Sequence, residues 1–296
     1  MGIILHQQGK LDEAIEAYNK AISIEREYAE AYNNMGIILH QQGKLDEAIN
    51  VYGKALSIKP DYTFAYYNMS SMLKGTIFKK PNRDLQKTIV SLLSKERYVR
   101  PKDIAMAAIC LLKLEPNLQK HLQLVDTEVI EGPLDVISDL SEFPLLLKLM
   151  SVCPLPDLEL EGLLTKLRFS ILSNITSLEE ASSKLINFQS ALALQCFTNE
   201  YIYNQTEDET KILQSLDASV KKALNDKKQP SPQAILTLAS YKALNEYDWC
   251  KSLVVTDEIK EVFIRQIDEP NQEKKLKQCL PIFEKITDSI SSKVRA

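Results

Sequence analysis

The chain opens with MGIILHQQGKLDEAIEAYNKAI at residues 1–22 and repeats it almost unchanged, as MGIILHQQGKLDEAINVYGKAL, at residues 35–56. The two copies are 34 residues apart and differ at four positions: Glu16/Asn50, Ala17/Val51, Asn19/Gly53 and Ile22/Leu56. Within the second copy, apolar residues recur at helical spacing up to Gly43 and then again up to Pro60. This period predicts two antiparallel helices per unit, stacked in a row because one hairpin cannot bury its apolar face alone.

Three segments of the repeat, AEAYNNMG, QGKLDEAI and KALSIKPDY, resemble a known family. They are similar to tetratricopeptide repeats, including those of O-linked N-acetylglucosamine transferases and many bacterial relatives. In that family an inner ladder of asparagines contacts the backbone of a bound peptide, which implies the same role for Asn34 and Asn68. The resemblance therefore implies a helical solenoid with a peptide-binding surface.

The repeats occupy residues 1–75 and amount to about two and a half units. The first copy starts at the seventh position of a unit, and the third begins at Thr63 but loses the pattern after Leu73, in KGTIFKKPNRD. Solenoids generally need about three repeats and polar caps at their ends. We therefore expect a chain that is truncated or that starts inside a longer array.

The remainder of the chain predicts helices without a repeat. Only two of the eight glycines, Gly132 and Gly162, lie after residue 75, and no useful stretch alternates as a strand would. Predicted helices cover residues 83–95, 102–113, 117–125, 133–140, 143–152, 157–174, 178–197, 207–226, 232–246, 257–267 and 271–292. Helix starts are supported by the capping pairs Ser177/Glu180 and Thr206/Glu209, and by Ser231 before Pro232.

The predicted fold class is all-α: a short tetratricopeptide helical solenoid followed by a non-repeat α-helical domain. We expect the repeats over 1–75, the helical domain over 76–282 and a C-terminal helical linker over 283–296.

Composition limits the kinds of partner. A net charge of −4 argues against nucleic acid, and no apolar run approaches the about 20 residues that span a bilayer. Five separated cysteines (Cys110, Cys153, Cys196, Cys250 and Cys279) form no C-x-x-C pair, which disfavours zinc binding. Their odd number, without a signal peptide, fits a reducing compartment. We expect a cytoplasmic protein with no membrane, nucleic-acid or metal partner.

The sequence also lacks the motifs of common catalytic sites. It contains no G-x-G-x-x-G, G-x-x-x-x-G-K or G-x-S-x-G segment, and His121 is the one histidine outside the repeats. The carboxylates of Glu207, Asp208 and Glu209 suit a helix N-terminus better than catalysis. The prediction is therefore no catalytic residue and no cofactor.

The predicted binding surface is the inner face of the first helix of each unit, because the spacing of its residues places them on one side of a helix. It comprises Ile3, His6 and Gln7 in the first copy, Asn33, Asn34, Ile37, His40 and Gln41 in the second, and Tyr67, Asn68 and Ser71 in the third. Side-chain amides offer donors and an acceptor to an extended peptide of any sequence. The alternative is a solvated polar face. His6 and His40 are expected too far apart for joint zinc ligation, since neighbouring helices lie about 10 Å apart.

Two charged runs follow the repeats. Residues 74–102 hold nine basic and two acidic side chains, whereas residues 126–161 hold nine acidic and one basic. They predict either a basic patch for an anionic partner or two solvated faces that attract each other. We favour the second interpretation, since proteins that bind phosphates usually add aromatic platforms or a defined motif.

A second resemblance rests on PLLLKLMSVCPLPDLELEGLLTKLRFSIL (144–172), ALALQCFTNEYIYNQTEDE (191–209) and EKITDSISSKVRA (284–296). These stretches are similar to the helical region that links tetratricopeptide repeats to an S-adenosylmethionine-dependent methyltransferase domain in bacterial proteins. The resemblance implies a peptide- or protein-binding scaffold, the targeting or accessory part of a methyltransferase system, with the catalytic domain absent from this sequence. The alternatives are a methyltransferase-related enzyme with its chemistry in residues 100–270, a glycosyltransferase-associated repeat protein, and a purely structural assembly module.

Overall fold

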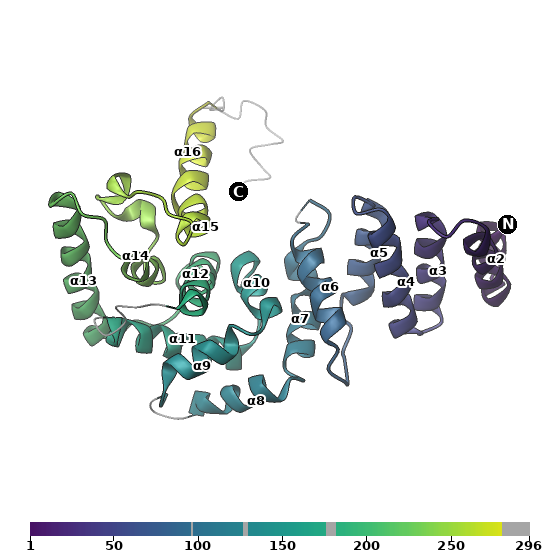
Figure 1. The fold of residues 1–296 in the computed structure, drawn as a ribbon, viewed down its shortest axis with the longest axis horizontal. Coiled ribbons are helices and arrows are strands. Elements are labelled where there is room, and N and C mark those ends of the chain that lie inside the picture. The colour runs from purple at the N-terminus through teal and green to yellow at the C-terminus, as the bar shows by residue number, and fades with distance from the viewer. Residues whose placement is uncertain (96, 127–129, 176–181, 280–296) are drawn as a thin grey trace, which may run out of the picture.

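The computed structural model describes residues 1–95, 97–126, 130–175 and 182–279, which contain helices and no strand. The predicted all-α class is confirmed. Figure 1 shows the N-terminal helices standing side by side in a row, in purple and blue, and leading into a bundle of teal, green and yellow helices. The molecule is therefore an elongated array joined to a more irregular helical body.

The repeat region consists of α1 (Gly2–Gln7), α2 (Leu11–Ile24), α3 (Ala29–Gln41), α4 (Leu45–Ile58) and α5 (Thr63–Leu73). Each helix packs against the next one along the chain. The turns within the first two hairpins use Gly9 and Gly43, whose φ angles of 76° and 73° lie in the left-handed region. Glycine adopts this conformation without steric cost, which allows the tight turn.

A glycine and a tyrosine fix the approach of the two helices in each hairpin. A Cβ atom built on Gly36 in α3 would lie 2.7 Å from the Tyr52 ring of α4, which is 1 % exposed. The first hairpin repeats the contact, with 2.7 Å between a Cβ built on Gly2 and the Tyr18 ring. A close-packed interior has no room for an added methyl group here. The duplicated sequence therefore produces a duplicated packing geometry.

The third unit departs from the repeat where the sequence predicts. α5 ends at Leu73. The second helix of the preceding unit, α4, begins at Leu45, so the repeat period would place the next second helix at Lys79. Instead, α6 (Arg83–Leu93) begins four residues later. Residues 74–82 form a long connection in place of the tight turn. Asn82 caps α6 by accepting a hydrogen bond from the Leu85 amide at 2.9 Å. The second helix of this unit is thus present but displaced.

The remaining elements form the helical body. They are α7 (Pro101–Leu112), α8 (Pro116–Leu122), η1 (Gln123–Asp126), α9 (Pro133–Leu140), α10 (Pro144–Val152), α11 (Leu158–Ser173), α12 (Ser183–Thr198), α13 (Glu207–Asn225), α14 (Pro232–Ala239), η3 (Leu244–Glu246), η4 (Cys250–Ser252), α15 (Lys260–Phe263), η5 (Ile264–Asp268) and α16 (Glu269–Cys279). One apolar core runs from Leu39 in α3 to Tyr203 after α12, and a second one surrounds α14. The repeats and the helices that follow them therefore share buried surface.

Two of the predicted helix starts are confirmed by their caps. Thr206 and Glu209 form a reciprocal capping box, and the Ser231 hydroxyl accepts from the Ala234 amide at 3.3 Å. The pair Ser177/Glu180, the linker over 283–296 and the predicted helix beyond Cys279 lie outside the described residues. In the part of the chain that the structure describes, no helix is both long and apolar enough to cross a membrane.

The single helix predicted over 232–246 is wrong. α14 ends at Ala239, and the separate 3-10 turn η3 follows. Gln266, which is fully buried, accepts from the Leu244 amide and donates to the carbonyls of Ala239 and Ala193, each at 3.1 Å. The Leu244 amide and the Ala239 carbonyl lie where the helix breaks, and the bond to Ala193 ties this break to α12. The helix predicted over 257–267 is likewise a four-residue α-helix followed by the π-helix η5, which carries Gln266.

The glycine–tyrosine contact predicts opposite effects of alanine at two helical glycines. Gly36→Ala should lower the free energy of unfolding by about 1 kcal/mol, because overpacking of about 1–3 kcal/mol exceeds the gain in helix propensity of about 1 kcal/mol. A Cβ on Gly53 meets no atom within 4 Å, so Gly53→Ala should raise it by about 0.5–1 kcal/mol. Urea unfolding followed by circular dichroism measures both. Equal changes at the two positions would contradict this account of the hairpin.

Gln266 should be among the most sensitive polar positions of the helical body. Gln266→Leu leaves the buried Leu244 amide without a partner and removes one hydrogen bond each from the Ala239 and Ala193 carbonyls, so it should cost about 1–3 kcal/mol of unfolding free energy. Gln272→Leu is the matched control, since Gln272 is exposed on α16 and should change stability by less than about 0.5 kcal/mol. The same urea titration applies, and a Gln266→Leu variant as stable as the control would refute the role of this side chain.

Candidate functional site

The predicted binding residues lie on α1, α3 and α5, the first helix of each unit. Six of them are exposed: Ile3, Gln7, His40, Gln41, Tyr67 and Ser71. His6, Asn34, Ile37 and Asn68 are half-buried, whereas Asn33 is buried. Side-chain hydrogen bonds join α1 to α3 and α3 to α5 across this side of the array. The structure thus brings residues from three units onto one continuous surface.

Three asparagines form a chain of amide hydrogen bonds on this surface. Asn68 Nδ2 donates to Asn33 Oδ1 at 3.0 Å, and Asn33 Nδ2 donates to Asn34 Oδ1 at 3.3 Å. Asn33 is 3 % exposed and bridges the other two. An amide has two donor hydrogens and two acceptor lone pairs, so Asn34 and Asn68 keep hydrogen-bonding capacity for a ligand. Their hydrogen bonds to the buried Asn33 fix their orientation.

A histidine and a glutamine join the first two units. His6 Nε2 lies 2.8 Å from Gln41 Oε1. The residue one period after Gln41 is Gly75, which has no side chain, so the third unit cannot offer His40 the same partner. Within the described ranges, no group of three or more His, Cys, Asp or Glu side chains is placed to hold a metal ion. His6 contributes a polar contact between the first two units.

Apolar side chains lie among the amides. Ile3 is 57 % exposed and Tyr67 is 64 % exposed, and Ile37 lies between them on α3. Exposed apolar groups of this size next to oriented amides offer both contact area and hydrogen bonds, the combination found in protein–protein interfaces. The surface suits an extended polypeptide.

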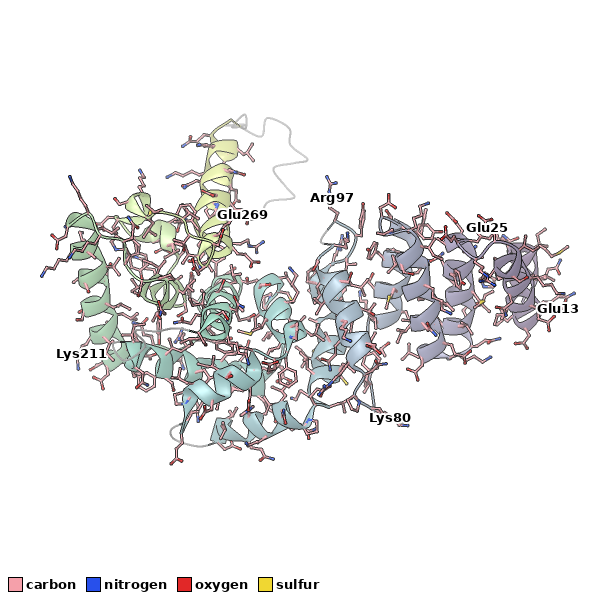
Figure 2. The ribbon with its side chains drawn as sticks, viewed as in Figure 1. Glu13, Glu25, Lys80, Arg97, Lys211 and Glu269 are labelled. Atoms are coloured by element: carbon pink, nitrogen blue, oxygen red, sulfur yellow. The ribbon has the colours of Figure 1, made fainter. Side chains whose placement is uncertain are left out.

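The basic run at residues 74–102 does not form one patch. Figure 2 places Lys80 and Arg97 at opposite edges of the array. Lys74 pairs with Asp103 at 3.6 Å and Arg83 pairs with Glu115 at 3.7 Å. Among the described residues, no ion pair joins this run to the acidic run at 126–161, so the attraction that we expected between the two is not formed.

A buried charged cluster, which the sequence analysis missed, lies between α11, α13 and α14. Arg168 is 2 % exposed, donates through Nη2 to the Asn204 carbonyl at 2.7 Å and lies 4.1 Å from the centre of the Tyr241 ring. Glu209 Oε1 accepts from the Tyr241 hydroxyl at 2.6 Å and lies 3.7 Å from Arg168. The signal available in the sequence was an arginine on the apolar side of a helix. The paired charges are enclosed and join α11 and α13 to the turn that follows α14.

Two buried cysteines, Cys153 and Cys196, carry protonated thiols. Burial raises the pKa of the Cys153 thiol to about 11 and that of the Cys196 thiol to about 12. Since the thiolate is the reactive form, these two side chains are poor nucleophiles at neutral pH. They behave as small buried apolar groups.

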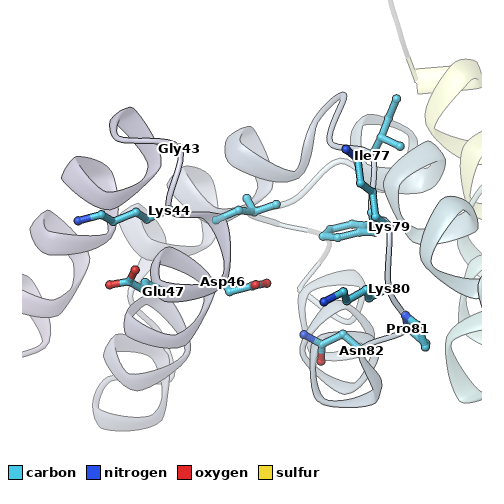
Figure 3. A pocket seen from close by; sticks show the side chains of 11 residues that line it. Gly43, Lys44, Asp46, Glu47, Ile77, Lys79, Lys80, Pro81 and Asn82 are labelled. Carbon is cyan, nitrogen blue, oxygen red and sulfur yellow. The ribbon is translucent and has the colours of Figure 1, made fainter.

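A groove that the sequence analysis did not predict lies between α4 and α6. Its first part, 580 Å³ in volume, has the α3–α4 turn and the start of α4 on one side and residues 77–82 on the other, as Figure 3 shows. Its second part, 490 Å³, follows α4 and α6, and the two parts share Asp46 and Asn82. None of the predicted surface residues of α1, α3 or α5 lines it. The array therefore offers two different surfaces.

Comparison with known families agrees with the repeat geometry. A family model described as TPR repeat matches residues 2–43, and one described as tetratricopeptide repeat matches residues 29–62. No curated protein matches the chain. The matches account for the two duplicated hairpins and end before the helical body. Residues 2–62 are tetratricopeptide repeats.

Proposed function

We propose that the surface formed by α1, α3 and α5 binds an extended segment of a protein partner. The observation that carries this proposal is the hydrogen-bonded chain Asn68–Asn33–Asn34, because it holds two partly exposed amides in fixed orientations on neighbouring helices. Fixed amides pair with a peptide backbone without an additional entropic cost of ordering them. Tetratricopeptide repeats typically bind proteins or peptides, which supports the same assignment.

Selectivity among partners is expected to come from the apolar side chains. The amides can bond the backbone of any peptide. Ile3, Ile37 and Tyr67 instead raise the affinity for partners whose apolar side chains pack on them. A chain of this kind works as a scaffold that captures one polypeptide and presents it to another. We assign the capture to the repeats at residues 1–75 and the presentation to the helices at 76–282.

The proposal predicts that the two amides act in binding. Random peptides of about eight residues, displayed and selected on the full chain, provide the probes. The Asn34→Ala and Asn68→Ala double variant should bind the selected inner-surface peptides about tenfold more weakly, because two oriented hydrogen bonds are lost. Fluorescence anisotropy of labelled peptides measures the affinity.

Asn19→Ala is the matched control. Asn19 is an exposed amide of the first copy on α2, outside the surface, so its removal should leave affinity and helicity unchanged. If the double variant keeps full affinity for every selected peptide while Asn19→Ala behaves as the wild type, the two amides have no part in binding.

We also propose an accessory role in a methyltransferase system, located in the cytoplasm. Support for the first comes from the resemblance of residues 144–172 and 191–209 to the linking region of repeat–methyltransferase fusions. Support for the second comes from the free thiols of Cys110, Cys153, Cys196 and Cys250, which suit a reducing compartment. In this role the chain itself binds the protein substrate and a separate domain supplies the cofactor.

The accessory role predicts no affinity of this chain for the cofactor. Isothermal titration of S-adenosylmethionine into the full chain should give no binding heat, whereas a methyltransferase domain titrated in parallel should saturate. Saturable binding to the full chain would instead favour an enzyme with its chemistry in the helical body.

A further inference from the structure

The groove between α4 and α6 has dimensions that suit a short extended peptide. Its lining on α4 runs from Asp46 to Ser57, a distance of about 16 Å along the helix axis. Since an extended chain advances about 3.3 Å per residue, this length accommodates about five residues. The wall opposite α4 is formed by residues 77–82 and the first turns of α6.

The displaced third unit opens the groove. α6 starts four residues late, and the connection at 74–82 takes the place of a tight turn like that around Gly43. This connection leaves Ile77 78 % exposed and Phe78 half-buried at one end of the groove. The apolar floor continues with Ile49 and Leu85, which are buried. The groove therefore combines exposed apolar groups with a defined floor.

The differences between the two repeat copies converge on this groove. Two of the four, Ala17/Val51 and Ile22/Leu56, exchange one apolar residue for another. At the other two positions the second copy loses a charge, with Asn50 in place of Glu16, and a side chain, with Gly53 in place of Asn19. Both Asn50 and Gly53 line the groove. Thus the second copy differs from the first in polar character only where it faces this space.

Gly53 has no packing reason to be glycine. A Cβ there meets no atom within 4 Å, whereas Gly36 in the same hairpin lies against a tyrosine ring. Glycine inside a helix costs about 1 kcal/mol relative to alanine. Gly53 thus leaves open space on α4 at a cost in helix stability, and a surface that admits a ligand backbone needs such space.

The charges of the groove favour an acidic ligand. Lys44, Lys79 and Lys80 line the loop end, and none of the three forms an ion pair within the described residues. With Lys54, the lining holds four lysines against the three acidic residues Asp46, Glu47 and Asp84, and Asp84 pairs with Lys87 at 3.0 Å. Figure 3 shows Lys80 pointing from the loop wall toward the space between the two walls.

We propose that the α4–α6 groove is a second peptide-binding site, for an extended segment that carries an acidic side chain next to an apolar one. The apolar side chain packs on Ile77 and Phe78, and the carboxylate pairs with the ammonium group of Lys80. Asn50, an exposed amide on α4, is placed to bond the ligand backbone. The site lies on different helices from the inner surface and works independently of it.

The test uses random peptides of about eight residues displayed against the full chain and against the Gly53→Asn variant. This variant restores the residue of the first copy, whose helix α2 folds with Asn19 at the equivalent position. Peptides retained by the wild type and lost on Gly53→Asn should carry an acidic residue beside an apolar one. Their affinity by fluorescence anisotropy should fall about tenfold in Gly53→Asn and again in Lys79→Glu/Lys80→Glu, and should weaken with added salt.

The control is the reciprocal change Asn19→Gly in the first copy, which should leave affinity for these peptides unchanged, as should the Asn34→Ala and Asn68→Ala double variant. If every selected peptide binds Gly53→Asn as well as the wild type, or if the groove-dependent peptides are basic, the proposed site is wrong. Peptides that depend only on Asn34 and Asn68 would uphold the inner surface and reject the groove. Peptides that depend only on Gly53 would do the reverse.

Discussion

The packing of a tyrosine ring against a glycine determines the geometry of the array. Both copies of the duplicated segment contain it, at Gly36 with Tyr52 and at Gly2 with Tyr18, and the ring fills the space that a side chain on the glycine would occupy. One period after Gly36 the residue is Ser70, whose hydroxyl donates to the Tyr66 carbonyl of its own helix at 2.8 Å. The close contact is therefore absent from the third unit, and α6 packs instead on α7 and α10. The repeat ends where its central contact is lost.

Most of the helices could be predicted from the sequence because caps and turn residues act on backbone groups close to them in the chain. Caps such as Thr206 with Glu209, and the glycine turns, satisfy backbone groups within a few residues of the helix end. The break after Ala239 could not be predicted in this way. It depends on Gln266, which lies 27 residues further along the chain and supplies hydrogen bonds from another element. A propensity pattern contains no information about such a distant partner.

The same limit applies to the candidate surfaces. Periodicity placed Asn33, Asn34 and Asn68 on one face, but only the structure shows that Asn33 is buried and bridges the other two. Proximity in the sequence does not imply proximity in space for the basic run, because α6 separates Lys80 from Arg97 and they reach opposite edges of the array. Spacing along one helix is fixed by geometry, whereas the position of one helix against another depends on packing.

The two nearly identical copies can be compared within one chain, which distinguishes the residues that the hairpin needs from the residues that it does not need. Residues that both copies share, including the glycine–tyrosine pair and the turn glycines, are sufficient for the hairpin, since the first copy folds with them. Residues that differ in polarity are therefore not required by the hairpin. Asn50 and Gly53 belong to this second group and lie on the same wall of one groove. Helix propensity opposes glycine at that position, and the hairpin does not need it, so a role for Gly53 lies in the open space above it, outside the fold of its own repeat.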